Sequence, residues 1–450
     1  MRPTPELLLA HTRPGPRYTS YPTAPHWRRD FSETDRAAMV RGIGTPASVY
    51  VHVPFCREQC TFCGCHMVVG RHQVLGDRYL DALSHQIAAL PLPEETLPVV
   101  RIHLGGGTPT WLDPAQLERL FGLLRRRFRP IEGAEISVEA DPEITTDEQV
   151  DVLADLGVNR LSLGVQSFEP RVLAAVNRPQ GASRVVAVLE RARGHGMQGL
   201  NVDLMYGLPY QNMHTFSATL DRTLALRPDR LAVFGYAHVP WLKPHQRQLP
   251  EAALPGPVER TALFLHARDR LTEAGYQAIG MDHFALPGDE LSVAQWEGRL
   301  HRNFMGYTTR PELELIGLGP SAISELRGGY VQDLPKLGPW WRAVETGGPL
   351  VERGCTLTEE DRLRRTVINE LMCNFSVSWD RLASSHGDVR ARLAEEIGAL
   401  APLEADGLVE RHPGGVRVTA LGRYLVRNVA MVFDAHLAPV AGRPRYSQTV

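Results

Sequence analysis

The sequence predicts an α/β protein with a partial or closed parallel (β/α) barrel and a small C-terminal helical, winged-helix-like domain. Three observations predict this class. Short β-branched runs alternate with longer helical patterns from about residue 48. The runs look almost continuously apolar, as strands covered by helices do. After about residue 345 the alternation gives way to helices.

The order of elements predicts repeated strand-helix units. The expected strands span residues 48–53, 99–104, 135–140, 160–165, 199–207, 230–237 and a weaker candidate, 276–281. The expected helices span residues 77–90, 114–127, 146–156, 183–195, 213–226 and 260–274. No reversal of strand direction is evident, so we expect a parallel sheet, either a full or partial barrel or a flatter, doubly wound sheet. In each case the chemistry belongs at the carboxyl ends of the strands.

The C-terminal part predicts helices over 358–372 and 388–407, two short strands around a Pro-Gly-Gly turn within 408–419, and a final helix over 420–437. Because this region carries no excess of basic residues, a lid or packing role is favoured over DNA binding. We therefore expect an N-terminal arm (1–45), a catalytic domain (46–345) and a C-terminal helical substrate or lid domain (346–450).

The composition is that of a folded globular protein. The chain has 450 residues, a 43% hydrophobic share and a formal net charge of -2, which favours neither nucleic acid nor a membrane as a partner. It shows neither an apolar run long enough to span a membrane nor a signal peptide, so a cytoplasmic location is expected. In that reducing compartment, clustered cysteines indicate a metal or redox site, and the distant Cys355 and Cys373 are expected to be buried and inert.

Four of the six cysteines lie in the segment "CREQCTFCGC". The flanking proline and glycine favour a loop after a strand over one face of a helix. Three thiolates at Cys56, Cys60 and Cys63 favour an iron-sulfur cluster with one iron left open for a ligand. A zinc site is the alternative, with Cys65 or His66 as the fourth ligand.

These motifs resemble a known family. "CREQCTFC" is similar to the C-x3-C-x2-C signature of radical S-adenosylmethionine (SAM) enzymes. The resemblance continues through "GGGTPT", "EISVEADP", "NRLSLGVQSF", "NVDLMYGLP" and "GLGPSAIS". Together with "GPRYTSYPTA" near the N-terminus and the extra cysteine of C-x3-C-x2-C-x-C, it covers nearly the whole chain. On these motifs the sequence resembles the oxygen-independent coproporphyrinogen III oxidases.

The resemblance implies a radical SAM barrel and an anaerobic reaction. Two propionate side chains of coproporphyrinogen III would be decarboxylated to vinyl groups, giving protoporphyrinogen IX of heme biosynthesis. The implied cofactors are a [4Fe-4S] cluster, one SAM at the cluster that yields a 5'-deoxyadenosyl radical, and a second SAM. An electron donor and an unidentified electron acceptor are implied as partners, and a monomer as the oligomeric state. The sequence does not tell which propionate reacts first.

The resemblance also assigns residues. The implied cluster ligands are Cys56, Cys60 and Cys63. The positions that match the first SAM site are Tyr50, Gly106, Glu139, Ala237 and Ile323. Those that match the second SAM site are Phe62, Gly107, Thr108, Gln166, Arg178 and Asp203. The expected catalytic residues are Cys65, Tyr50, Glu139 and Arg178.

Two points stay open at this stage. We hypothesise that Arg17 and Arg302 pair with propionates that are not decarboxylated, although Arg17 could instead simply pin the N-terminal arm. A heme-binding chaperone on the same scaffold is the alternative function, and the "PRYTSYPT" arm together with Cys65 favours the enzyme. His66 and Met67 depart from the asparagine and lysine of the family's best-known members.

Overall fold

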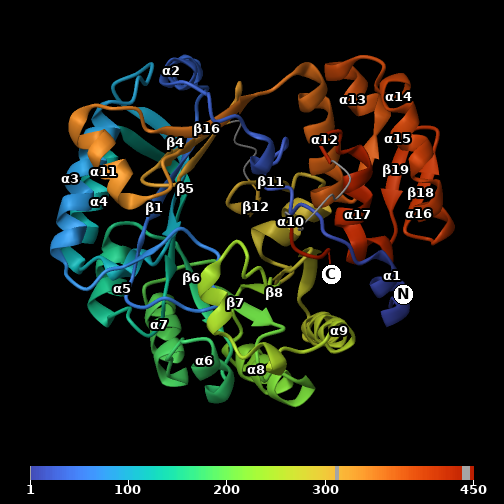
Figure 1. Ribbon diagram of the computed structural model, residues 1–450, viewed down its shortest axis with the longest axis horizontal. Helices are drawn as coiled ribbons and strands as arrows, with labels where there is room; N and C mark the ends of the chain where they lie inside the picture. The colour runs from blue at the N-terminus through green and yellow to red at the C-terminus, as the bar shows by residue number, and fades with distance from the viewer. Residues whose placement is uncertain (1, 310–313, 438–445, 450) are drawn as a thin grey trace.

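The large sheet forms a partial barrel. The computed structural model describes residues 2–309, 314–437 and 446–449. In this part of the chain twelve strands join one sheet, in the order β16-β15-β14-β13-β1-β4-β5-β6-β7-β8-β10-β9. Since β16 and β9 lie at opposite edges, the barrel is open (Figure 1). The prediction of a parallel sheet within an α/β fold is confirmed. Of the arrangements expected, the chain adopts the partial barrel, whose two edges do not meet.

Seven neighbouring strands of this sheet run parallel. The six stronger strand candidates are all present, and a seventh parallel strand that the sequence analysis missed, β13, pairs with β1. The parallel strands are β13 (Leu315–Leu318), β1 (Ala47–Val53), β4 (Leu97–Gly106), β5 (Phe128–Ala140), β6 (Arg160–Gln166), β7 (Asn201–Tyr206) and β8 (Arg230–Gly235).

The expectation that strand direction never reverses was wrong. The weaker candidate is β9 (Gln277–Gly280), which pairs antiparallel with β10 (His283–Ala285), and β10 pairs antiparallel with β8. At the other edge β14 (Ile323–Leu326), β15 (Gly329–Asp333) and β16 (Val351–Thr356) are also antiparallel. The physical reason at the β9 edge is connection length, because a short turn joins antiparallel strands whereas a parallel pair needs a crossover.

Helices cover the outer face of the sheet (Figure 1). Four of them begin with a capping box that satisfies free backbone N–H groups, for example Asp113 with Gln116 and Asn212 with Thr215. The helices of this part are α2 (Glu33–Arg41), α3 (Val74–Ala88), α4 (Pro114–Arg125), α5 (Asp147–Asp155), α6 (Pro170–Ala175), α7 (Ala182–Gly194), α8 (Met213–Leu226), α9 (Pro257–Glu273), α10 (Glu290–Trp296) and α11 (Leu337–Thr346).

Along the inner strands, buried residues alternate with partly buried ones. The expectation of continuously apolar strands did not include this alternation. In β6 and β7 every second residue is buried, and the residues between them are only partly buried. The apolar set packs under the outer helices, whereas the other set faces the barrel interior. A cavity of about 180 Å³ lies there, lined by side chains that include His103, Ser137, Glu139, Ser162, Asn201 and Asp203. The interior of the barrel is therefore polar.

The C-terminal part is helical, as predicted, and its apolar core is shared with residues of the arm and of the barrel. Its sheet has the order β17-β19-β18, and the expected hairpin is β18 (Val409–His412) and β19 (Gly415–Val418). The expected single helix over 420–437 was wrong, because the segment breaks into two 3-10 turns and one short helix, with residues 425–431 buried as one continuous run rather than on one helix face. The remaining elements are α12 (Glu359–Asn374), β17 (Ser376–Ser378), α13 (Trp379–His386), α14 (Val389–Arg392), α15 (Ala394–Ala399), α16 (Ala401–Ala405), η5 (Gly422–Leu425), α17 (Val426–Ala430) and η6 (Met431–Phe433).

The N-terminal arm, which includes α1 (Pro5–His11), runs beside the C-terminal part (Figure 1). His11 Nε2 lies 3.0 Å from Asp406 Oδ2, and Pro14 forms an isolated β-bridge with Gln448. The large sheet continues through β16, past residue 345. The three-part division thus stays a prediction. No helix in residues 2–309, 314–437 and 446–449 is long and apolar enough to cross a bilayer.

Candidate active site

The cysteine segment forms a loop directly after β1, as expected. Two very short parallel strands, β2 (Phe55–Cys56) and β3 (Val68–Val69), close the loop at its base. The backbone N–H of Val68 donates to Pro54 O at 2.8 Å, and that of Gly70 donates to Cys56 O at 2.9 Å. Cys60 and Cys63 thus lie in irregular chain at the carboxyl end of a parallel strand.

One side of the loop is held by the turn between α6 and α7. The backbone N–H of Thr61 donates to Val176 O at 3.0 Å. The side-chain amide of Asn177 donates to Gln59 O at 2.9 Å. These bonds fix the backbone on both sides of Cys60 through residues more than a hundred positions away in the sequence.

The other side of the loop is held by the segment after β8. His245 Nε2 lies 2.8 Å from Cys63 O, and Gln246 Nε2 donates to Phe62 O at 3.2 Å. The same amide donates to Ala237 O at 3.1 Å. Phe62 and Ala237, expected at two different SAM sites, are therefore brought together by one glutamine.

Each of the three signature thiols contacts a polar partner. All three cysteines are half-buried, and Cys65 is exposed. The contacts, each at 3.4 Å, join Cys56 Sγ to Thr108 Oγ1, Cys60 Sγ to Arg178 Nη1 and Cys63 Sγ to the backbone N–H of Cys65. Donors aimed at sulfur suit thiolates, so these residues fit the thiolate ligand set of an iron-sulfur cluster.

The described residues contain no group of three or more His, Cys, Asp or Glu side chains placed to hold a metal ion. A cluster is held differently, since each of its thiolates binds a separate iron. The three signature cysteines come from one loop and keep their own polar partners, which is compatible with that arrangement.

Arg178 lies at the cluster loop and is buried, with 10% of its side chain exposed, so it is no solvated surface arginine. Its guanidinium is 3.2 Å from Asp141 Oδ2 and also donates to Gly164 O. Burial opposes its charge, but Asp141 and Cys60 outweigh burial and raise the pKa of Arg178 above its usual value. The side chain stays a cation close to the cysteine loop.

The glycines after β4 permit close backbone approach. A Cβ on Gly107 would lie 2.6 Å from Phe55 O, and one on Gly106, whose φ is +112°, would lie 2.7 Å from the His52 ring. The backbone N–H of Gly107 donates to Val53 O at 2.8 Å, and that of Thr108 donates to Phe55 O at 2.7 Å. The "GGGTPT" segment therefore packs against the start of the cysteine loop.

Tyr50 and Glu139 meet through a histidine. The Tyr50 ring stacks on His103 at a centroid distance of 5.9 Å, and His103 Nε2 lies 3.5 Å from Glu139 Oε1. Glu139 Oε2 also accepts from the backbone N–H of Gly106 at 3.2 Å. Burial alone would raise the pKa of Glu139, but His103 and Gly106 hold it below the usual value. Glu139 is thus an anion at the cavity wall.

Asp203 lies in the same cavity with only neutral hydrogen-bond donors. Asn201 Nδ2 donates to one oxygen at 2.7 Å, and the Ser162 hydroxyl donates to the other at 3.4 Å. Burial, with the charge of Glu139, raises the pKa of Asp203 to about 7. At the end of the neighbouring β6, Gln166 adopts a positive φ of 68°.

Ile323 is buried in β14, in an apolar cluster with Trp27 and Tyr330. Phe304 packs against this cluster and also against the one that contains Tyr50. The two positions expected at the first SAM site from opposite halves of the sequence are therefore linked by one aromatic ring.

Arg17 and Arg302 lie apart from the cysteine loop, near one another. Arg17 forms an ion pair with the buried Asp282, which supports its role of pinning the arm. The Arg302 Nε donates to Arg17 O at 3.3 Å, and its guanidinium lies 4.6 Å from the centre of the Tyr307 ring. These contacts join the arm to the barrel.

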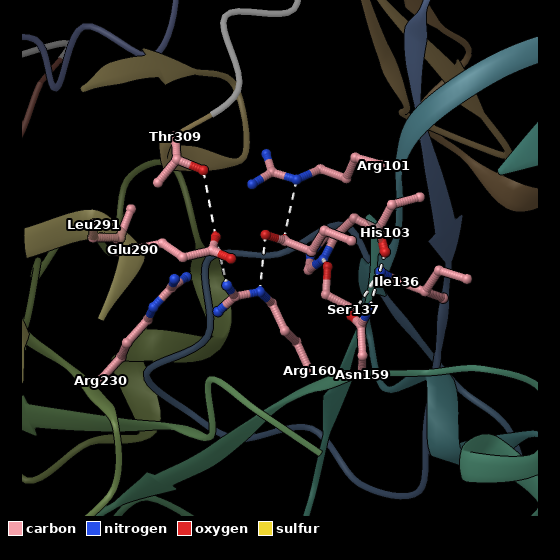
Figure 2. A network of polar contacts seen from close by, with 12 residues as sticks. Arg101, His103, Ile136, Ser137, Asn159, Arg160, Arg230, Glu290, Leu291 and Thr309 are labelled. Atoms are coloured by element: carbon pink, nitrogen blue, oxygen red, sulfur yellow. Dashed lines mark hydrogen bonds and ion pairs between the residues drawn. The ribbon is translucent and has the colours of Figure 1, made fainter. Parts of the chain in front are cut away.

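A second group of buried arginines lies at the amino-terminal half of the barrel interior (Figure 2). Figure 2 shows Arg160 between Arg101 and Arg230. Each guanidinium has a carboxylate partner. The pairs are Arg101 to Glu135 at 3.1 Å, Arg160 to Glu135 at 2.9 Å, Arg160 to Glu290 at 2.8 Å and Arg230 to Asp289 at 2.8 Å.

Sequence reasoning missed several residues of the site, among them His103, Asp141 and Gln246. For His103 a signal existed. Polar residues alternate with apolar ones in "RIHLG", "EISVE" and "NVD", which is typical of strands with one polar face. Gln246 and Asp141 carry no such signal, since only the tertiary fold brings them to the loop.

Comparisons with known proteins agree with this arrangement. Residues 50–223 match the family model described as the Radical SAM superfamily, and residues 357–425 match the HemN C-terminal domain. The solved Escherichia coli coproporphyrinogen III oxidase (HemN), described as a radical SAM enzyme, superposes with a TM-score of 0.90 and 45% identity, over 94% of this chain and 98% of that chain. Fold and cysteine loop together define a radical SAM protein.

Curated relatives give the narrower family. The oxygen-independent coproporphyrinogen III oxidase of Salmonella typhimurium is 44% identical, over 99% of this chain and 98% of its own length. That of Synechocystis sp. is 43% identical, over 99% of this chain and 97% of its own length. The chain belongs to the family of oxygen-independent coproporphyrinogen III oxidases.

Proposed function

We propose that the chain catalyses the anaerobic oxidative decarboxylation of two propionates of coproporphyrinogen III to vinyl groups, giving protoporphyrinogen IX. The observation that carries this proposal is a three-cysteine loop held at the carboxyl end of a partial barrel, in a chain that matches these oxidases over its full length. A radical SAM barrel by itself supports only the superfamily.

The cofactors of this family are a [4Fe-4S] cluster and SAM. Cys56, Cys60 and Cys63 would hold the cluster. A cluster held there would supply the electron for reductive cleavage of SAM and so the radical chemistry of the reaction. The chain's own residues would position these groups.

The first SAM site would be formed around the Tyr50, His103 and Glu139 chain. Glu139 is an anion with its oxygens directed to the cavity, so it suits an amine or ribose hydroxyl of SAM. Gly106 would let the ligand approach the backbone, with Ala237 and Ile323 as apolar walls.

The second SAM site would be formed around Arg178 and Asp203. Arg178 stays cationic and suits the carboxylate of SAM, and burial raises the pKa of Asp203 to about 7. The remaining residues proposed for this site are Phe62, Gly107, Thr108 and Gln166. Cys65, exposed beside Cys63, would face substrate and serve in proton transfer.

The direct test is anaerobic incubation of the reconstituted, reduced protein with SAM and coproporphyrinogen III. We expect protoporphyrinogen IX, detected by fluorescence after oxidation, together with 5'-deoxyadenosine and carbon dioxide. Heme binding without turnover would contradict the proposal and support the chaperone alternative. The electron donor, the electron acceptor, the monomeric state and the cytoplasmic location stay predictions.

Replacing a ligand tests the cluster. Cys56→Ser is expected to abolish SAM cleavage and to lower the iron and sulfide content, because a hydroxyl replaces a thiolate ligand. Cys355→Ala, at a buried thiol outside the loop, is the matched control and should keep both. Deoxyadenosine formation by the Cys56 variant at the wild-type rate would contradict the assignment of Cys56 as a cluster ligand.

A further inference from the structure

Three arginines, two of them buried, meet where the N-terminal arm, the barrel and the C-terminal part come together. Arg17 lies on the arm, Arg302 on β11 (His301–Asn303) and Arg427 on α17. Arg302 and Arg427 have relative exposures of 7% and 6%. Burying a guanidinium away from water is costly unless an anion or a full set of acceptors compensates it.

Few carboxylates lie close to these three arginines. Asp282 forms an ion pair with Arg17 and also accepts from His283 Nδ1 at 2.7 Å. In the described part of the chain no ion pair joins Arg302 or Arg427 to a carboxylate. Arg427 donates to the backbone carbonyls of Gly15 and Gln448, so its hydrogen bonds have acceptors.

Arg302 has less. Its Nε donates to Arg17 O, whereas its buried Nη1 has no hydrogen-bond partner among the described residues. Burial is the main cause that lowers the pKa of Arg302, and the nearby charge of Arg17 adds to it. The fold therefore buries the Arg302 cation with one N–H donor unused. Packing, and no neighbouring carboxylate, keeps the side chain in place.

Arg302 lines a cavity of about 210 Å³. The other walls are arm residues 18–21 and residues of α12, including Arg365 and Glu370. Those two charges are already used, because Arg365 lies 3.5 Å from Glu325 and Glu370 lies close to Arg381. Arg302 is thus the cation of this cavity that no carboxylate balances.

The cavity adjoins the active site. β11 and β12 (Gly306–Thr308) form a hairpin at the boundary, in which Arg302 pairs across the strands with Tyr307. The Arg302 guanidinium lies 4.6 Å from the centre of the Tyr307 ring, and Tyr307 lines the barrel cavity together with Glu139 and Asp203. A group bound at Arg302 would therefore lie next to a residue of the active-site wall.

We propose that Arg302 binds a propionate of the tetrapyrrole that is not decarboxylated, and that Arg17 does not bind substrate but holds the arm through Asp282. This proposal rests on the proposed function, since it assumes a substrate that carries four carboxylates. A carboxylate bound in the cavity beside the Arg302 guanidinium would supply the missing negative charge. The site would then set which propionates are held away from the radical.

The first experiment measures substrate affinity. In reconstituted holoenzyme, Arg302→Gln is expected to raise KM for coproporphyrinogen III about 10- to 100-fold, the loss typical of a hydrogen bond to a charged group, and to change kcat much less. Arg302→Lys should recover part of the loss. The matched control is Arg390→Gln on the surface of α14, which should leave KM unchanged. An unchanged KM in Arg302→Gln overturns the proposal.

The first part of the second experiment uses the wild-type protein alone. Protoporphyrinogen IX keeps only the two unreacted propionates, so it and its dimethyl ester are compared as inhibitors of wild-type turnover. We expect the ester to inhibit about 10- to 100-fold more weakly, and the difference to shrink to less than about threefold in Arg302→Gln. Equal inhibition of the wild type by acid and ester, or by neither, overturns the proposal. Failure of wild-type turnover itself would refute the proposed function instead.

Discussion

Two groups of arginines in this protein differ in how their charge is balanced. In the barrel, Arg101, Arg160 and Arg230 each have a carboxylate partner (Figure 2). At the arm, Asp282 pairs with Arg17, whereas the buried Arg302 has no carboxylate partner among the described residues. Balanced buried ions complete a fold, whereas an unbalanced one is retained at a cost.

The balanced group has unused N–H donors too, since Arg160 Nη1 and Arg230 Nη2 lack partners. Both groups also border a cavity, of about 180 Å³ at the barrel arginines and about 210 Å³ at Arg302. The difference lies in charge, because each barrel arginine pairs with a carboxylate, whereas no carboxylate of the described residues pairs with Arg302. A buried cation without a counter-ion beside a cavity indicates space for an anionic ligand.

The largest effect is expected when the balanced group is broken. Glu135→Gln removes the buried carboxylate that Arg101 and Arg160 share and leaves less negative charge between the two cations. We expect it to lower the free energy of unfolding by about 3–5 kcal/mol, measured by denaturant titration of the apoprotein. A loss below about 1 kcal/mol would mean that the network is not what holds these strands together.

Acid should weaken the same group. Burial would raise the pKa of Glu135, but the neighbouring arginines lower it to about 2, from an ordinary value of 4.5. A lowered carboxyl pKa contributes stability that is present above pH 4.5 and is lost as pH falls toward 2, here about 3 kcal/mol. Unfolding curves measured across that window should show the loss in the wild type, and a smaller loss in Glu135→Gln.

The unbalanced group should respond in the opposite direction. Arg302→Met removes a buried cation and keeps most of the side-chain volume, so we expect the free energy of unfolding to rise by about 1 kcal/mol. Thermal denaturation of the ligand-free protein measures it. A clear loss of stability would show that Arg302 is a structural residue, as the barrel arginines are.

The smallest effect is expected at the surface. Arg381 is half-exposed and pairs with Glu370 on α12. Because solvent screens such pairs, Arg381→Gln should change the free energy of unfolding by less than about 0.5 kcal/mol. A larger change would mean that burial does not decide how much an ion pair contributes to the free energy of unfolding of this protein.

The sequence by itself determined the class, the six main strands, the cysteine loop and the family. These follow from local information, because β-branched runs, turn residues and thiol spacing are encoded in neighbouring residues. The alternation of polar residues in β4, β5 and β7 was also present, although the expectation of continuous apolar strands overlooked it.

Only the tertiary structure decided the rest. It reversed the strands at both sheet edges, broke the expected final helix, and brought Gln246 and Arg178 to the cysteine loop. It also gave different partners to Arg17 and Arg302, which the sequence analysis had both considered for propionate binding. Arg17 pairs with Asp282, whereas the Arg302 Nη1 has no hydrogen-bond partner among the described residues. The physical reason is that charge balance and burial depend on neighbours distant in the chain, and spacing along a sequence carries no information about which carboxylate a buried arginine will meet.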